Sequence, residues 1–217
     1  MKPLSEKIKQ NLERVSSDIK PYNAKIVAVT KYYGKDEMME VYRQGLRDFG
    51  ESRAVESIEK INSLDEEVKS KSTYHFIGHL QTNKAKKVVG VFDYIHSVDS
   101  VNLAKELATV AQNKGIIQKI FIQVNNAFEE QKFGIAPSQL NNILNEIQKL
   151  KNLEVVGLMN IAPFTDDEFE LHKLFREIYK LKEEFQLKEL SMGMSHDYKI
   201  ALEEGATIVR LGKILFE

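Results

Sequence analysis

Eight short apolar runs alternate with segments of helical periodicity along the 217 residues, and this alternation constrains the fold more than any other feature. The runs Lys25 to Thr30 and Lys119 to Val124 carry β-branched residues on both faces, as is typical of strands buried on both sides. The other runs lie near 48–49, 74–77, 93–97, 153–158, 187–190 and 206–210. Strands that alternate with helices indicate parallel βαβ units.

Apolar residues at helical spacing separate these runs. They predict one helix over 8–19, before the first strand, and another after Pro137, which suits a first helical turn. Further helices are expected near 36–46, 53–64, from 83, around 103–110, at 171–185 and at 196–204. The polar stretch 63–72 is expected to be a loop. The pattern predicts a closed (β/α)8 barrel of TIM type with an extra N-terminal helix, although an open doubly wound sheet has the same local pattern.

Bulk properties exclude several classes of protein. We expect one domain over residues 1–217, since barrels of this size commonly fold as one unit. The net charge of −1 provides no general attraction to nucleic acid or to an anionic membrane. No apolar run approaches the roughly 20 residues that span a bilayer, and the first residues lack the apolar segment of a secretory signal. We therefore expect a cytoplasmic protein, and a lone barrel favours a monomer.

Metal binding is not expected. The chain has no cysteine and five histidines, which excludes disulfides and thiolate ligands. His75 and His79 are four residues apart but lie on either side of a strand end, and no His-Glu-x-x-His pattern is present. The basic cluster of Lys84, Lys86 and Lys87 is most simply a solvated helix face.

The candidate site residues lie where strands end, which is where barrels carry their functional groups. Lys31 leaves the first strand directly after its apolar run. A partly desolvated position lowers the pKa of an ammonium group, so that the amine can attack an aldehyde, although most lysines are merely solvated. Glu51 follows the second strand, either as a carboxylate of the barrel mouth or as the partner of a nearby cation. Asn125 follows the fifth strand.

The turns after the last two strands are candidates for phosphate binding, as in many barrels. The turn Met192–Ser195, which includes Met194, has a glycine for close approach and a serine at an expected helix start. After the last strand, Gly212 and Lys213 offer backbone N–H groups. Each feature alone is more simply explained as a helix cap or a turn. Closure of the barrel would nevertheless bring Lys31 beside both turns.

An amine beside a phosphate site is what a phosphorylated aldehyde requires. Arg210, at the end of the last strand, would also suit a pyridine nitrogen, since arginine is a known partner of that atom in pyridoxal phosphate (PLP) sites. A guanidinium only donates hydrogen bonds, so it would keep the nitrogen unprotonated. Such a ring withdraws electrons poorly.

Several sequence blocks resemble those of the PLP homeostasis protein family, whose barrel is similar to the N-terminal domain of alanine racemase. The resemblance covers nearly the whole chain in the same order. The matching blocks are Val27–Lys31, Phe49–Glu51, His75–Lys84, Gly157–Met159, Leu190–Asp197 and Val209–Gly212. The chain is thereby expected to have a fold-type III PLP barrel.

The resemblance implies a role for each candidate. Lys31 would carry PLP as a Schiff base, and Arg210 would contact the ring nitrogen. Ser195, Gly212 and the N–H of Lys213 would hold the phosphate. Asn125 lies in the block near the ring, and Met194 lies in the Ser-Met-Gly-Met-Ser block. The sequence departs from the family in several places. It has Thr30-Lys31-Tyr32 where the family usually has Ser-Lys-Thr, Ser52 in place of asparagine, Lys213 in place of threonine and His79 in place of a common proline.

We expect a carrier that binds PLP and delivers it to other proteins, such as PLP-dependent apo-enzymes, with little or no turnover. Racemisation by alanine racemase uses a second acid/base from another domain, for which the sequence after Phe216 leaves no room. Three alternatives remain: a weak amino-acid racemase, a Schiff-base aldolase without PLP, and a sensor of a phosphate ligand in which Lys31 is incidental.

Overall fold

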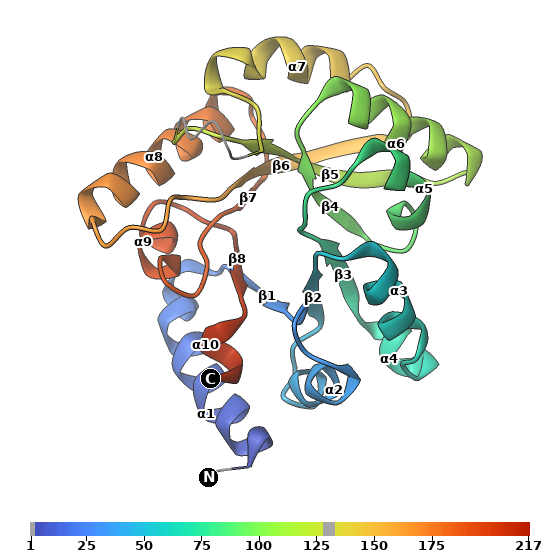
Figure 1. Ribbon diagram of the computed structural model, residues 1–217. Helices are drawn as coiled ribbons and strands as arrows, with labels where there is room; N and C mark the ends of the chain where they lie inside the picture. The colour runs from blue at the N-terminus through green and yellow to red at the C-terminus, as the bar shows by residue number, and fades with distance from the viewer. Residues whose placement is uncertain (1–2, 128–132) are drawn as a thin grey trace.

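Eight parallel strands form a closed barrel in the computed structural model, which describes residues 3–127 and 133–217 (Figure 1). Around the barrel the strands are β1 (Lys25–Val29), β2 (Asp48–Glu51), β3 (Thr73–Phe76), β4 (Tyr94–Val98), β5 (Gln118–Val124), β6 (Leu153–Asn160), β7 (Glu189–Ser191) and β8 (Ile208–Leu211). Strand β8 pairs in parallel with β1, with Val27 opposite Arg210 and Ala28 opposite Leu211. The prediction of a (β/α)8 barrel is confirmed, and the open sheet is wrong.

Helices cover the outside of the barrel (Figure 1). They are α1 (Leu4–Ile19), α2 (Lys35–Arg43), α3 (Ala54–Asn62), α4 (Glu66–Lys71), α5 (Ala85–Val88), α6 (Val101–Asn113), α7 (Leu140–Ile147), α8 (Glu168–Glu184), α9 (Tyr198–Glu203) and α10 (Lys213–Phe216), with 3-10 turns η1 (Lys20–Tyr22), η2 (Thr82–Lys84) and η3 (Pro137–Gln139). Side chains cap α6 and α8: Ser100 accepts from the N–H of Leu103, and Asp167 accepts from that of Glu170. The expected N-terminal helix is α1, which packs against α10.

Two helices were not expected from the sequence. Helix α4 lies in the stretch 63–72, where a loop was predicted. It forms because Val68, which is 5 % exposed, packs into the core, while Lys71 and Glu67 pair along the helix. Helix α10 follows β8 directly and buries Phe216, whose ring stacks on Tyr33 with centroids 3.8 Å apart. Both helices are short, so tertiary packing stabilises them more than their own periodicity does.

Two cores hold the fold together. The larger lies between the barrel and its helices and includes most of the apolar helix faces. The smaller lies inside the barrel and consists of Val27, Phe121, Val156, Met159 and Ile208. The barrel interior also holds polar side chains, among them the fully buried His96 and Ser191. A buried polar group needs a hydrogen-bond partner, so these side chains mark a part of the interior with a specific arrangement.

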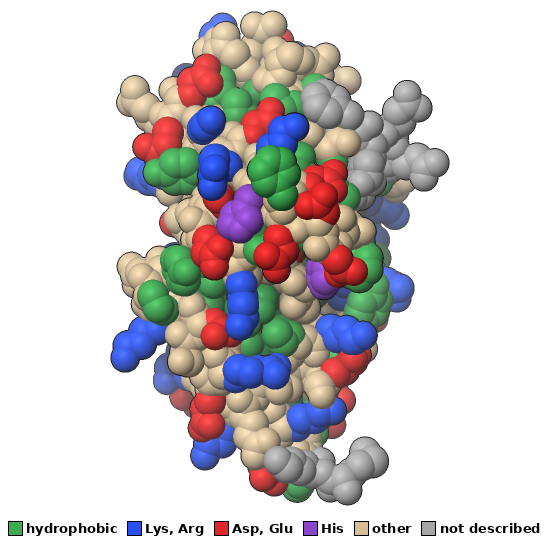
Figure 2. Space-filling view, turned by 90° about the vertical axis from the view of Figure 1, so that its left-hand side faces the viewer, with side chains coloured by type: hydrophobic (Ala, Val, Ile, Leu, Met, Phe, Trp, Pro, Cys, Tyr) green, Lys and Arg blue, Asp and Glu red, His purple; other side chains and the backbone are tan. Residues whose placement is uncertain are grey.

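The surface mixes charges of both signs. Figure 2 shows lysines and arginines interspersed with aspartates and glutamates on one face of the molecule, in keeping with the net charge of −1. No helix in the described part of the chain is both long enough and apolar enough to cross a membrane.

Candidate functional site

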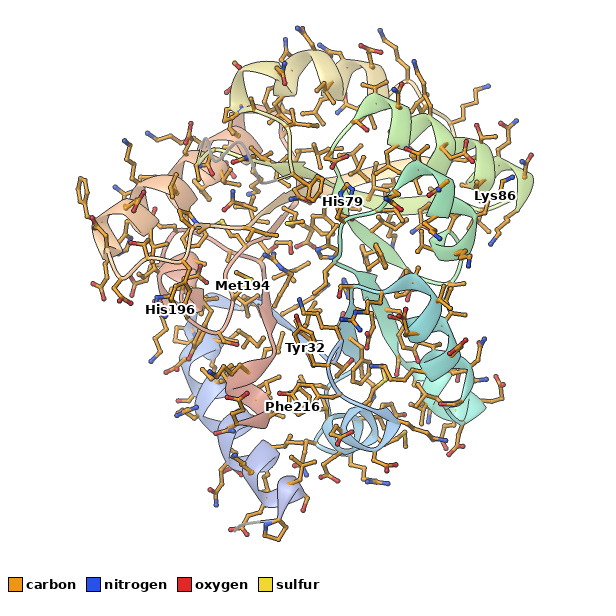
Figure 3. All side chains as sticks on the ribbon, viewed as in Figure 1. Tyr32, His79, Lys86, Met194, His196 and Phe216 are labelled. Atoms are coloured by element: carbon orange, nitrogen blue, oxygen red, sulfur yellow. The ribbon has the colours of Figure 1, made fainter. Side chains whose placement is uncertain are left out.

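Closure of the barrel brings the end of β1 beside the turn after β8. A Cβ on Gly212 would lie 3.4 Å from both the Cβ and the carbonyl oxygen of Val29, two residues before Lys31. Because glycine has no side chain, the backbone after β8 approaches β1 closely. In Figure 3, Tyr32 is labelled beside β1 and β2, and Met194 beside β8.

Lys31 is partly exposed at this mouth. Its Nζ lies 5.0 Å from the centroid of the Tyr32 ring, which is within the range of a cation–π contact. Tyr32 itself is 75 % exposed. The amine therefore lies at the boundary between the barrel interior and solvent.

A buried ion pair holds the loop that carries Lys31. Glu51 is 2 % exposed and lies 2.5 Å from Nζ of Lys60, so it is the partner of a cation. Its carboxylate also accepts hydrogen bonds from the hydroxyls of Thr30, at 2.6 Å, and Ser57, at 3.1 Å. Lys60 in turn donates to the carbonyl oxygens of Thr30 and Tyr33, at 2.8 and 3.0 Å. The backbone on both sides of Lys31 and Tyr32 is thus fixed from α3.

The turns after β7 and β8 also meet. The backbone N–H of Ile214 donates to the hydroxyl of Ser195 at 3.3 Å. Gly193 has φ of +90°, and a Cβ there would lie 2.6 Å from Cβ of Ala201, so the turn requires glycine. Lys213 is exposed, with its Nζ 3.5 Å from the carboxylate of Glu217. The hydroxyl of Ser195 and the backbone N–H groups of the turn after β8 therefore lie close together.

The helix start expected at Ser195 is displaced. Helix α9 begins at Tyr198, and its N-cap is Asp197, which is 4 % exposed. The carboxylate of Asp197 accepts from the backbone N–H of Met194 at 2.6 Å. Burial raises the pKa of Asp197, while the hydrogen bond from Met194 and the charge of Arg210 act in the opposite direction. Ser195 therefore lies in the turn before the helix, where its hydroxyl contacts the turn after β8.

Arg210 is buried inside the barrel near the mouth. Its guanidinium donates to the carbonyl oxygen and the hydroxyl of Ser191, at 2.6 and 2.8 Å, and to the carbonyl oxygen of Asn160, at 2.8 Å. Burial lowers the pKa of Arg210 to about 10, against the effect of the Asp197 charge. The group therefore stays charged at neutral pH. These three bonds use three of the five donors of a guanidinium.

Asn125 follows β5 directly, as expected. Its backbone N–H donates to the carbonyl oxygen of Ile135 at 3.0 Å, which brings the chain after 133 back to the strand end. Gly134 packs closely here, since a Cβ on it would lie 2.9 Å from the nitrogen of Asn125. Asn125 thus has a defined place at the same end of the barrel as Lys31.

His75 and His79, the pair weighed as metal ligands, have separate surroundings. His75 lies inside the barrel, whereas His79 stacks on Phe133 with centroids 3.5 Å apart and lies 3.5 Å from Asp99. Within 3–127 and 133–217, no three histidine or acidic side chains are arranged to hold a metal ion. Lys84, Lys86 and Lys87 are exposed along η2 and α5.

A hollow of about 860 Å³ lies between α8 and the residues that follow Asn125. Its lining includes Asn126, Phe169, His172, Arg176 and Glu177. Most of these side chains belong to one helix, and Arg176 is paired with Glu204. The hollow therefore lacks the converging groups from several strand ends that the mouth has.

Comparisons with known proteins place this barrel in a class. The family model described as alanine racemase, N-terminal domain, matches residues 5–217. Among solved structures, an alanine racemase from Clostridium difficile shares the fold, with a TM-score of 0.75 at 14 % identity over 95 % of this chain and 56 % of that one. At that identity the likeness concerns the fold alone.

Closer relatives narrow the class. The pyridoxal phosphate homeostasis protein of Aquifex aeolicus is 39 % identical over 89 % of this chain and 86 % of its own, and the human protein of that name is 37 % identical over 100 % and 84 %. The structure of PipY from Synechococcus elongatus with PLP bound is 36 % identical, covers 97 % of this chain and 100 % of that one, and has a TM-score of 0.85. The chain belongs to the pyridoxal phosphate homeostasis protein family, which confirms the resemblance in the sequence blocks.

Sequence reasoning missed two sets of residues. One is Lys60, whose tether to the Lys31 loop has no local signal, because Lys60 is one of many lysines on amphipathic helices. The other is the pair His75 and His96, since the five histidines were weighed as metal ligands and no role inside the barrel was predicted for this pair. Both histidines point into the barrel, and the apolar residues next to them in their strands face outward. This alternation is the sequence pattern from which their inward position could have been predicted.

Proposed function

We propose that the chain binds PLP at the barrel mouth as a Schiff base on Lys31 and serves in its storage and delivery. The observation that carries the proposal is the meeting of three parts: the end of β1 with Lys31, the turns holding Ser195 and Gly212, and the buried guanidinium of Arg210. The names of the relatives and the PLP in the PipY structure support the choice of ligand.

The residues at the mouth fit this cofactor. Ser195 has a hydroxyl that already accepts from the N–H of Ile214, so the two turns can hold a phosphate between them. A side chain at Gly212 would fill space against Val29, and the absence of one lets a phosphate approach the N–H of Lys213. Arg210 is charged and has donors beyond its three protein bonds for a ring nitrogen. Asn125 and Met194 complete the proposed set at the ring and at the phosphate turn.

Lys31 is suited to reversible attachment. When bound, PLP supplies an aldehyde that primary amines convert to a Schiff base. Lys31 would supply the primary amine for this condensation, in which its nitrogen would lose two hydrogens and the aldehyde its oxygen, together released as water, so that no oxidant or reductant is needed. An incoming amine can displace Lys31 by the same exchange, which is the physical basis for release at an exposed mouth.

We propose that turnover is low. A charged Arg210 can only donate a hydrogen bond, so the pyridine nitrogen that it contacts would be the unprotonated acceptor and the ring a weak electron acceptor. The proposal also comprises a single domain over 1–217 that acts as a monomer in the cytoplasm and transfers PLP to apo-enzymes.

Borohydride trapping tests the attachment. The protein is incubated with PLP, reduced and mapped by peptide mass spectrometry, with Lys31→Ala and the surface variant Lys86→Ala in parallel. We expect the pyridoxyl group on Lys31, loss of the yellow near-visible absorbance in Lys31→Ala, and no change in Lys86→Ala. A label found only on other lysines would overturn the assignment.

Deuterium exchange tests the low turnover. The loaded protein is incubated with L-amino acids in deuterated water, and loss of the α-hydrogen is followed by NMR. Exchange at ordinary enzyme rates, roughly 1–1000 per second, would favour a racemase instead.

A further inference from the structure

A continuous chain of hydrogen bonds crosses the barrel interior to Arg210. Asp48 lies 3.1 Å from Nε2 of His75, whose Nδ1 lies 2.9 Å from Nε2 of His96. Nδ1 of His96 lies 2.9 Å from the hydroxyl of Ser191, to which Arg210 donates at 2.8 Å. The five side chains come from five different strands, and the three in the middle are at most 1 % exposed.

The two side chains at the ends of this hydrogen-bond series, Asp48 and Arg210, determine which partner donates in each bond. A guanidinium only donates hydrogen bonds and a carboxylate only accepts them. The hydroxyl of Ser191 therefore accepts a hydrogen bond from Arg210 and donates one to Nδ1 of His96. His96 then donates from Nε2 to His75, and His75 donates from Nε2 to Asp48. Every hydrogen bond is satisfied with both rings neutral.

The burial and the charges around these side chains favour neutral imidazole rings. Burial holds the pKa of His96 well below its usual value, and the nearby His75 and Arg210 act in the same sense. Two N–H groups facing each other at 2.9 Å would repel, so the two rings cannot both be protonated. The other charged group that acts on Arg210 is Asp197.

We propose that His96 is a positioning residue for the cofactor. By accepting a hydrogen bond from the Ser191 hydroxyl, it keeps a lone pair of that oxygen directed toward Arg210. The guanidinium is thereby oriented toward the ring nitrogen. The inference rests on the proposed function and adds to it. The proposed attachment through Lys31 and the proposed phosphate turns do not involve His96.

Loss of the acceptor on His96 should affect only the contact between Arg210 and the ring nitrogen. Without the acceptor on His96, the hydroxyl of Ser191 can rotate and present its proton to Arg210, which displaces the guanidinium. Contacts to the aldehyde and the phosphate come from other residues and would remain.

The test compares PLP with its 1-deaza analogue, in which a CH group replaces the ring nitrogen. Dissociation constants of both ligands are measured for the wild type, His96→Phe and His96→Asn, with thermal unfolding as a check of folding. Phenylalanine keeps a ring of similar size but no acceptor, whereas asparagine keeps a polar atom near the position of Nδ1.

We expect the wild type to prefer PLP by roughly tenfold or more, as for a hydrogen bond from a charged donor. His96→Phe should lose most of this preference while its affinity for the deaza analogue changes little, and His96→Asn should recover part of it. A preference in His96→Phe equal to that of the wild type would overturn the inference, as would an equal loss of both ligands. A wild type without a Schiff base on Lys31 would instead defeat the proposed function.

Discussion

The ammonium group of Lys60 lies 2.5 Å from the buried carboxylate of Glu51 and donates to the carbonyl oxygens of Thr30 and Tyr33. One side chain of α3 thereby ties the end of β2 to the loop that carries Lys31. The pair is nearly excluded from water, since the side chains of Lys60 and Glu51 are 12 % and 3 % exposed.

Lys60→Met should destabilise the protein by about 3–5 kcal/mol, because it leaves the carboxylate of Glu51 buried without its cation. The measurement is the free energy of unfolding in urea. Lys69→Met is the matched control, since Lys69 also lies 2.5 Å from a glutamate, but that partner is 89 % exposed. The control should cost less than about 1 kcal/mol. Equal losses in the two variants would contradict the buried pair.

Gly193→Ala should cost about 2–4 kcal/mol of unfolding free energy, because the residue has φ of +90° and a Cβ would overlap with Ala201. Gly115→Ala separates the two causes. Gly115 also has a positive φ, of +65°, but a Cβ there would meet nothing within 4 Å. Its cost should therefore be only about 1 kcal/mol. If both variants unfold alike, close packing at the β7 turn does not matter.

The stability of the wild type should fall as the pH falls below 6.5, the ordinary pKa of a histidine. Burial lowers the pKa of His96 in the folded state, so in this range the unfolded chain binds a proton that the folded chain does not. His96→Phe removes this group and should reduce the slope by up to about 1.4 kcal/mol per pH unit. Urea unfolding between pH 5 and pH 7 measures it.

The exposed His196 provides the comparison for that slope. His196→Phe tests whether the loss of any imidazole gives the same change. Identical slopes for wild type and His96→Phe would mean that His96 does not resist protonation in the fold.

Ser195→Ala should weaken binding of PLP by about tenfold or more, since a hydrogen bond to a charged phosphate is lost. Binding of pyridoxal, which has no phosphate, should stay nearly unchanged. Fluorescence titration with both ligands measures this difference, and Ser17→Ala, an exposed position in α1, is the control. A similar loss for pyridoxal would place the effect of Ser195 elsewhere than at the phosphate.

Much of the fold follows from local patterns. The run Lys119 to Val124 lies within β5, and even the short run at Asp48 and Phe49 lies in a strand. Pro137 does begin a helical turn, η3, which leads into α7. The patterns missed α4 and α10, because each short helix depends on a few buried contacts that a sequence window does not contain.

The candidate site was predictable only in part. Strand ends indicated Lys31, Asn125, Arg210 and the glycine turns as candidates, since the carboxyl ends of parallel strands meet at one edge. Asp197, as the acceptor for the N–H of Met194, and Lys60, as the partner of Glu51, could not be found this way. Their roles depend on which side chain of one element faces which side chain of another.

Residue order alone accounts for the eight alternating strands and helices and for the positions where polar groups leave the strands. These features are local, because periodicity of 2 or 3.6 residues records which face of an element is buried. The pairing of β8 with β1 arises only when the sheet closes. The close approach of Gly212 to Val29 and the series of hydrogen bonds from Asp48 to Arg210 depend on the same closure. Strand register joins residues that are far apart in the chain, and no local pattern contains that information.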